Sequence, residues 1–187
     1  MSRRLRPVIF LVGFIVLFGL VKSGWKLTSL ETTTTSTVPK AAMCQSSDLR
    51  VRWVDGSASA GTIHAWVRIH KASGPLCKLP AYFTVNLYDN AGGALPGTLS
   101  PMTESDSLTG WFGQPLSPRS TAIDLKMGDT VGVALSFGND SSCPAVATMQ
   151  FNYAGTSGTS QQFTVAPTYM SAMCNGGEGI ISPTFTN

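Results

Sequence analysis

The chain has 187 residues, of which 43% are hydrophobic and only 12% are charged. This composition excludes a fully disordered protein and predicts one folded domain with an N-terminal appendage. The charged share is about half of that in a typical soluble domain. Together with plentiful Gly, Ser, Thr and Pro, it favours many short strands and turns over long solvated helices.

The net charge of +3 and the pI of about 8.8 could suggest a nucleic-acid partner. The positions of the charges along the chain argue against one. From Cys44 onward, seven Lys or Arg stand against nine Asp or Glu, a net of about −2. We therefore expect no nucleic-acid binding. The remaining basic residues all precede Cys44: Arg3, Arg4, Arg6, Lys22, Lys26 and Lys40.

Residues 7–21 form an uncharged apolar run, PVIFLVGFIVLFGLV, that follows three arginines. The run is shorter than the roughly 20 residues that span a bilayer, but flanking Lys22, Trp25 and Lys26 extend it by snorkelling and interfacial contact. No small-residue cleavage motif follows it. We interpret residues 1–25 as one hydrophobic helix, a single-pass signal anchor in the cell membrane, with a cleaved signal peptide as the alternative. The excess of N-terminal arginine places the N-terminus in the cytoplasm and the rest outside.

Residues 26–43 contain the polar run Thr32 to Thr37, followed by Val38 and Pro39. Such a segment has too few apolar residues to fold by itself. We predict a disordered, Thr-rich stalk that either holds the domain away from the membrane or serves as a plain spacer.

From Cys44 onward, apolar and polar residues alternate with period two, which is typical of half-buried strands. Turn signals rich in Gly, Asn and Asp separate the runs. We expect about eight strands, at 49–53, 63–70, 83–88, 121–125, 130–137, 147–153, 162–166 and near 180–181.

This spacing predicts an all-β domain over residues 44–187, an antiparallel β-sandwich of immunoglobulin-like type outside the membrane. Residues 93–119 are the exception, being rich in Pro, Ser, Thr and Gly. We interpret this segment as one edge strand with buried Trp111 and Phe112; a binding loop is the alternative.

Four cysteines, Cys44, Cys77, Cys143 and Cys174, all lie on the exported side, where disulfides persist. They form no C-x-x-C motif, so their spacing is not that of a zinc or iron–sulfur site. Spacing alone leaves three pairings open. We prefer the pairing that joins each cysteine to its neighbour in sequence, which closes two loops of about thirty residues and stabilises the domain by roughly 3–4 kcal/mol per bond.

Ten short stretches between Cys44 and Pro183 carry a family resemblance. They are Cys44, Asp48-Leu49-Arg50-Val51, Ala60-Gly61-Thr62, Leu76-Cys77-Lys78-Leu79-Pro80-Ala81-Tyr82, Val85-Asn86-Leu87-Tyr88-Asp89, Leu125-Lys126-Met127-Gly128, Leu135-Ser136-Phe137, Cys143, Met173-Cys174 and Ile181-Ser182-Pro183. On these residues, the sequence resembles the actinobacterial domain of unknown function 4232 family. This resemblance implies an exported β-sandwich with Cys44 bonded to Cys77 and Cys143 to Cys174, and it implies no activity. Ala81, Phe83 and Met127 depart from the residues usual in that family.

No residue pattern in the chain points to catalysis, so we expect no enzyme, metal site or cofactor. His64 and His70 are the two histidines, about 20 Å apart along one expected strand, too far to share a metal. The sequence lacks the G-x-S-x-G and H-E-x-x-H motifs. Met170, Met173 and Cys174 suit Cu(I), but core methionines and an oxidised cysteine explain them better.

One group of outward-facing residues is a candidate binding surface. If the first two expected strands are neighbours, their polar faces form a basic, aromatic ridge suited to an anionic glycan, a lipid headgroup or a protein. If a loop or another sheet covers Trp66, the ridge is ordinary. Its members are Arg50, Arg52, His64, Trp66, Arg68 and His70.

The sequence thus favours a non-catalytic binding or interaction module, displayed outside the membrane, whose partner is a cell-envelope glycan or a membrane protein. The second hypothesis is a structural accessory subunit of a larger membrane complex. A metal carrier or enzyme is the third.

Overall fold

The structure is a computed structural model, which describes residues 41–59, 61–138, 142–170 and 178–186. The predicted anchor and residues 26–40 of the predicted stalk lie outside these residues. Within the described ranges, no helix has the length and apolar character needed to cross a membrane.

The described residues form an all-β domain, which confirms the predicted class. Twelve strands replace the expected eight, because several segments of two to four residues pair with strands far away in the sequence, where no alternation signals them. Two short 3-10 helices are η1 (Ser46–Asp48) and η2 (Thr156–Gly158). The strands are β1 (Leu49–Ser59), β2 (Thr62–Lys71), β3 (Cys77–Leu79), β4 (Thr84–Tyr88), β5 (Ala94–Leu95), β6 (Thr98–Pro101), β7 (Ile123–Leu125), β8 (Thr130–Gly138), β9 (Thr148–Ala154), β10 (Ser160–Val165), β11 (Glu178–Ile181) and β12 (Phe185–Thr186).

The strands make three sheets. A six-stranded sheet has the order β1-β2-β8-β11-β6, and β12 follows β11 along the same edge of β8. A four-stranded sheet has the order β10-β9-β4-β5, and β3 pairs with β7. These pairings are antiparallel, except that β6 and β11 are parallel. The sheets are thus mainly antiparallel, as predicted, whereas the immunoglobulin-like type stays a prediction.

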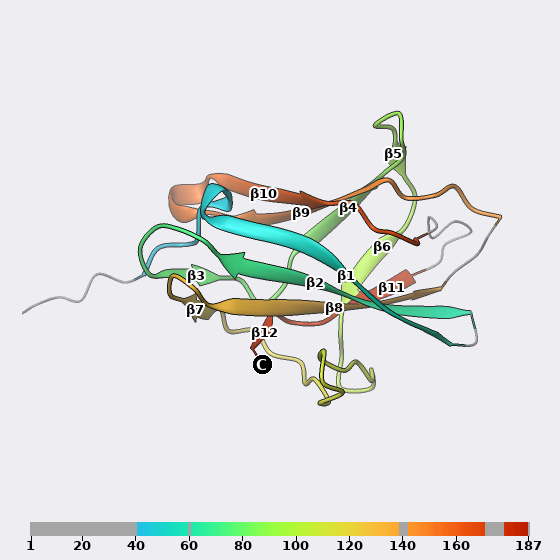
Figure 1. Cartoon of the computed structure of the whole chain (residues 1–187), viewed down its shortest axis with the longest axis horizontal. Helices are drawn as coiled ribbons and strands as arrows, with labels where there is room; N and C mark the ends of the chain where they lie inside the picture. Colours follow the sequence, from blue (N-terminus) through green and yellow to red (C-terminus); the bar gives the residue numbers. More distant parts are fainter. Residues whose placement is uncertain (1–40, 60, 139–141, 171–177, 187) are drawn as a thin grey trace, which may run out of the picture. The chain divides into compact units, whose positions relative to one another are not determined.

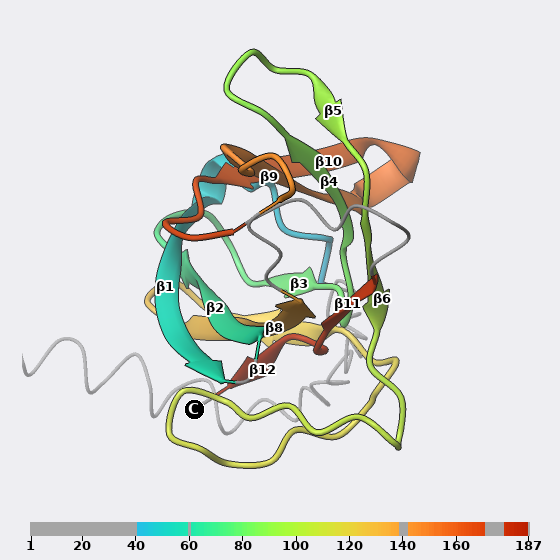
Figure 2. The same ribbon diagram turned by 90° about the vertical axis from the view of Figure 1, so that its right-hand side faces the viewer.

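The two larger sheets lie in two layers, with the four-stranded sheet above the six-stranded one in Figure 1. Viewed from the end, the larger sheet curves from β1 through β8 to β6 (Figure 2). Alternate residues of β2, β8 and β9 fill the space between the layers, as the period of two predicts. The residues with no more than 1% exposure include Val67, Ile69, Val133, Leu135, Phe137, Met149 and Phe151.

Four aromatic rings close one part of this core. Phe83 packs edge-on against Phe151, Tyr153 and Phe163, with ring centroids 5.3–5.8 Å apart. Phe151 and Phe163 stack at 5.1 Å from neighbouring strands β9 and β10. Such contacts add to the stability that burial alone supplies.

The same alternation that buries Val67 and Ile69 also buries a charged residue, Lys71, at the end of β2. Its side chain is 0% exposed, and its Nζ lies 2.9 Å from Oδ2 of Asp48, which is 20% exposed. Ser73 donates a hydrogen bond to the other carboxylate oxygen at 3.1 Å. Gly74 follows with a φ of 79°, and a Cβ there would lie 2.3 Å from the Asp48 carboxylate. A side chain at position 74 would therefore displace the carboxylate.

Replacing Asp48 with Asn is expected to leave the buried Lys71 ammonium without a counter-charge. Breaking a fully buried pair costs about 3–5 kcal/mol, and because Asp48 is partly exposed we expect a loss of about 2–3 kcal/mol in urea denaturation at pH 7. Asp124→Asn is the matched control. It breaks the 2.8 Å Lys78–Asp124 pair, whose side chains are 31% and 57% exposed, and should cost below about 1 kcal/mol. Equal losses in the two variants would contradict this assignment.

The same pair predicts how stability depends on pH. The hydrogen bond from Lys71 lowers the pKa of Asp48 below its usual 3.8, against the opposing effect of burial and with help from Ser73 and the Lys71 charge. A depressed pKa stabilises the fold fully above the unfolded value, and this contribution is lost as pH falls through the folded value. The stability difference between wild type and Asp48→Asn should therefore be full at pH 7 and shrink below about pH 4. A difference that stays constant in acid would argue against the ion pair.

Candidate functional site

One predicted disulfide is confirmed. Cys44 and Cys77 are bonded, with a sequence separation of 33, and both are buried. The backbone of residues 42–44 also runs along β3, since Lys78 N–H donates to the Ala42 carbonyl and Cys44 N–H to the Lys78 carbonyl. The fold therefore already includes Ala42 and Met43, at the end of the predicted stalk. Cys174 lies outside the described residues, so its pairing with Cys143 stays a prediction.

The six residues of the predicted ridge are brought together, because β1 and β2 are neighbours. Arg50 lies opposite His70, and Arg52 lies opposite Arg68. The two arginines of β1 are exposed, whereas the outward residues of β2 are all half-buried. His70 contacts the Thr130 hydroxyl at 3.1 Å on the next strand, β8.

The segment between β6 and β7 covers the β2 side of this ridge. The indole N–H of Trp66 donates to the Thr109 carbonyl at 2.9 Å, and the Arg68 guanidinium lies 4.6 Å from the Trp111 ring centroid. Trp111 in turn packs on Phe185, with centroids 5.2 Å apart. We call this group the outer cluster; its buried members are Met102, Leu108, Ala134 and Phe185, and Trp66 and Trp111 pack against them. Because the loop covers Trp66 and Arg68, these two residues do not form part of an open basic face. This is the alternative in which a loop covers Trp66 and the ridge is ordinary.

The predicted pair of buried aromatics in this segment is half right. Trp111 is half-buried in the outer cluster, but its neighbour Phe112 is 80% exposed. The tight turn at Gly110–Gly113 explains the difference, because it directs the two consecutive side chains to opposite sides. The predicted edge strand is present as β6.

Truncating Trp111 to Ala should release the segment between β6 and β7 from Arg68 and Ala134. We expect a loss of about 2 kcal/mol in urea denaturation, less than the value for a fully buried tryptophan. Amide exchange in residues 103–118 should accelerate as well. Phe112→Ala, one position along, should change stability by less than about 0.5 kcal/mol because Phe112 is exposed. A larger effect at Phe112 than at Trp111 would refute the proposed cover.

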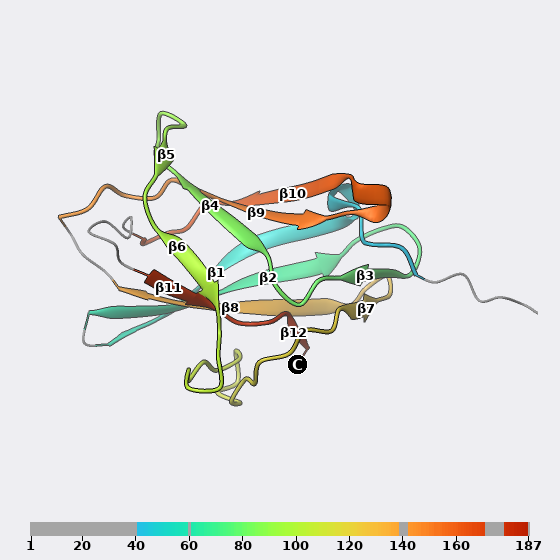
Figure 3. The same ribbon diagram turned by 180° about the vertical axis from the view of Figure 1, so that it is seen from behind.

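A second candidate site is a groove on the opposite side of the domain, where the two sheets separate. From behind, β4 and β6 diverge below β5, one belonging to each layer (Figure 3). The groove between them has a volume of about 600 Å³. That size lies within the roughly 300–1,000 Å³ of ordinary ligand sites.

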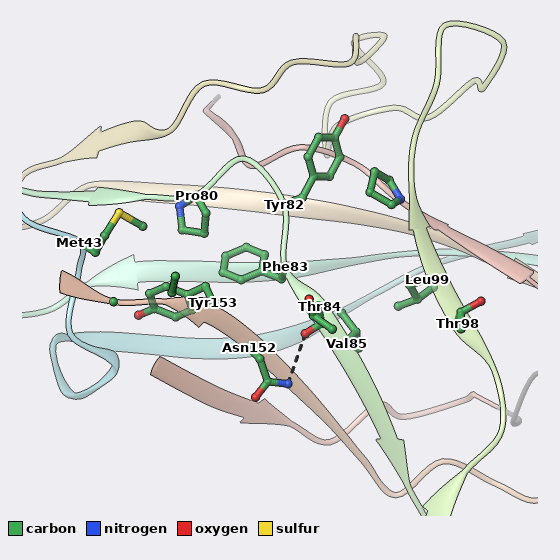
Figure 4. Close-up of a pocket in the computed structure, with 13 residues that line it drawn as sticks. Met43, Pro80, Tyr82, Phe83, Thr84, Val85, Thr98, Leu99, Asn152 and Tyr153 are labelled. Atoms are coloured by element: carbon green, nitrogen blue, oxygen red, sulfur yellow. Dashed lines mark hydrogen bonds between the residues drawn. The ribbon is translucent and has the colours of Figure 1, made fainter. Parts of the chain in front are cut away.

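The walls of the groove are apolar and aromatic, and its rim is polar. Phe83 and Tyr153 form one wall, and Leu99 of β6 stands across from them (Figure 4). Thr84 and Asn152 lie at the rim, where the Asn152 amide donates to the Thr84 carbonyl at 3.4 Å. The remaining lining residues are Met43, Pro80, Tyr82, Val85, Thr98, Pro101, Ala154 and Gly155.

The connection from β3 to β4 borders the groove. Residues 80–83 lead from β3 to the four-stranded sheet, and Thr184 holds them in place. Its hydroxyl donates to the Pro80 carbonyl at 2.7 Å and its N–H donates to the Ala81 carbonyl at 2.7 Å. Arg119 donates to the Thr184 carbonyl and so secures the same point. These contacts fix the point from which β4 begins.

The groove is electrically neutral. No lining residue is charged, and the one phenol inside it with a strong shift is Tyr153, whose pKa is raised to about 12 by burial and then by the nearby Asp48 charge. Tyr153 therefore stays protonated and donates to the Cys44 carbonyl at 3.0 Å. Elsewhere in the described part of the chain, no three His, Cys, Asp or Glu side chains gather as metal ligands.

One edge of the groove is also an unpaired strand edge. The hairpin partner β5 pairs with β4 only at Leu87 and Tyr88. On that side, Thr84 to Asn86 have no strand partner among the residues described. Unpaired strand edges accept extended chains through main-chain hydrogen bonds.

Sequence reasoning singled out the ridge and missed the groove. The groove joins Met43, β4, β6 and β9, which lie far apart in the sequence and show no shared motif. The one available signal was the pair of prolines, Pro80 and Pro101, which end strands at its mouth.

These features define the class of the described part: an all-β domain with a disulfide and a neutral, open groove. No protein-family model matches the chain, and neither a curated protein nor a solved structure matches it. The resemblance to the domain of unknown function 4232 family therefore stays a prediction.

Proposed function

We propose that this chain is a non-catalytic binding module, anchored in the cell membrane by residues 1–25 and displaying an immunoglobulin-like β-sandwich outside it. The observation that carries the binding role is the neutral groove between β4 and β6. The anchoring rests on the apolar run at residues 7–21 and the arginines before it.

The groove favours an extended, uncharged polypeptide segment of a partner as its ligand. Its apolar walls suit hydrophobic side chains, while the hydroxyl and amide groups of Thr84, Thr98 and Asn152 suit a backbone. The open edge of β4 supplies main-chain donors and acceptors for strand addition. An anionic glycan fits less well, because the lining offers no cation.

The test is selection of short displayed peptides by the full chain held in nanodiscs. We expect the selected peptides to be uncharged and β-prone. Thr84→Lys places a cation at the rim and should weaken their binding at least tenfold, since a desolvated charge opposes a neutral ligand. Thr84 is exposed, so this substitution should leave the fold intact.

Thr164→Lys is the matched control, because Thr164 is also exposed on the four-stranded sheet but lies on β10, away from the groove and from the open edge of β4. It should leave peptide binding unchanged. Selected peptides that are strongly charged, or that bind both variants equally, would rule out the groove as the site.

A second candidate, the structural accessory subunit, is favoured by the exposed ring of Phe112. Large exposed aromatics are enriched in protein interfaces. If this role holds, the full chain purified in mild detergent should carry a stoichiometric protein partner, and Phe112→Ser should release it. A monomer with either residue would remove this candidate.

A further inference from the structure

Two apolar side chains project into solvent from neighbouring turns at one end of the domain. Met127, in the turn between β7 and β8, is 71% exposed, and Leu76, directly before β3, is 48% exposed. The other large apolar side chains that are mainly exposed, within the described residues, are Phe112 and Tyr169. Most aliphatic side chains of this size lie in the core, so the neighbouring pair needs an explanation.

The strand pairings place Leu76 and Met127 close together. In the antiparallel pair of β3 and β7, Cys77 lies opposite Leu125. Leu76 continues one strand outward, and Met127 follows two residues beyond Leu125 on the other. The backbone of Lys71 fastens the same turn to β2, because Gly128 N–H donates to its carbonyl at 2.9 Å.

The polypeptide leaves the domain toward this same end. Met43 forms a parallel bridge with Lys78, so residues 42–44 run in the same direction as β3. Moving backward along both segments, Ala41 is reached at the end where Leu76 lies. In Figure 1 the chain enters the domain beside β3 and β7.

The segment before Ala41 is short. Residues 26–40, between the predicted anchor and the domain, span about 50 Å when fully extended, and roughly 20 Å on average as a flexible chain. If residues 26–40 form the flexible stalk that the sequence predicts, the end that carries Leu76 and Met127 stays within about 20 Å of the bilayer surface on average.

Charges on the strands and turns that carry Leu76 and Met127 are balanced. Lys71 is paired with Asp48, and Lys78 with Asp124. In the turn itself, the exposed Lys126 is followed by Asp129, whose carboxylate accepts a hydrogen bond from the Lys126 N–H at 2.8 Å. Neither strong repulsion from nor strong attraction to anionic lipid follows from this arrangement.

From this geometry we infer that the turns carrying Leu76 and Met127 form a lipid-contact face, which rests the domain on the bilayer that holds its anchor. This inference depends on the membrane anchoring in the proposed function, but not on the groove. The two side chains enter the interface between headgroups and acyl chains, where their burial removes apolar surface from water. The contact is apolar, so it needs no anionic lipid.

The experiment uses the full chain in phosphatidylcholine nanodiscs that contain a phosphatidylcholine with a diazirine near the headgroup. After illumination, mass spectrometry locates the lipid adducts. We expect adducts in residues 7–21, at Leu76 and at Met127, with severalfold less at Phe112. Replacing a third of the lipid with phosphatidylglycerol should leave this pattern unchanged.

The variant Leu76→Gln with Met127→Gln should lower the adducts in both turns severalfold while those in residues 7–21 persist. Phe112→Gln is the control and should change neither. Adducts in residues 7–21 without adducts in the two turns would overturn the lipid-contact face and leave the anchoring intact. Absence of adducts from residues 7–21 as well would overturn both the lipid-contact face and the anchoring. Equal adducts at Phe112 and Met127 would show that the domain contacts lipid in no preferred orientation, which would also overturn the lipid-contact face.

Discussion

The buried ammonium of Lys71 is the constraint on which one end of this domain depends. A charge at an inward position of β2 requires a counter-charge, and Asp48 supplies it from η1, just before β1. The backbone of Lys71 is bonded to Asp129 and Gly128, and the Asp48 carbonyl accepts from Ala72. Ion pair and backbone together therefore fix the start of β1, the end of β2 and the turn before β8, and the Cys44–Cys77 disulfide lies beside them.

At the other side of the core, the groove forms where the chain passes from the four-stranded sheet to the six-stranded sheet. After β3 the chain crosses to the four-stranded sheet at Pro80 to Phe83, and after β5 it returns to the larger sheet as β6. Because β4 and β6 belong to different layers, they do not pair, and aromatic side chains line the space between them. The groove is thus a result of topology and not of a local motif.

The contrast between these features explains what could be predicted from the sequence. Strict alternation in β2, β8 and β9 predicted their inward faces correctly, since period two is a local property. The same parity places Lys71 on the inward face of β2. Its burial was not predicted, because charged residues are expected outside. The shortest strands, the cover over Trp66 and the groove depend on contacts between distant residues, such as Trp66 with Thr109 and Phe83 with Tyr153. Local patterns carry no information about such contacts.

The position of β11 has a consequence for how the polypeptide acquires this structure. β11, at Glu178–Ile181, lies between β8 and β6 and joins them, although both precede it by dozens of residues. A nascent chain that has reached only residue 170 therefore exposes unpaired edges on β8 and β6. Such edges invite pairing with other chains, and contacts across long sequence separations form slowly. The larger sheet is completed only after β11 has been synthesised, so until then these edges stay open to pairing with other copies of the chain.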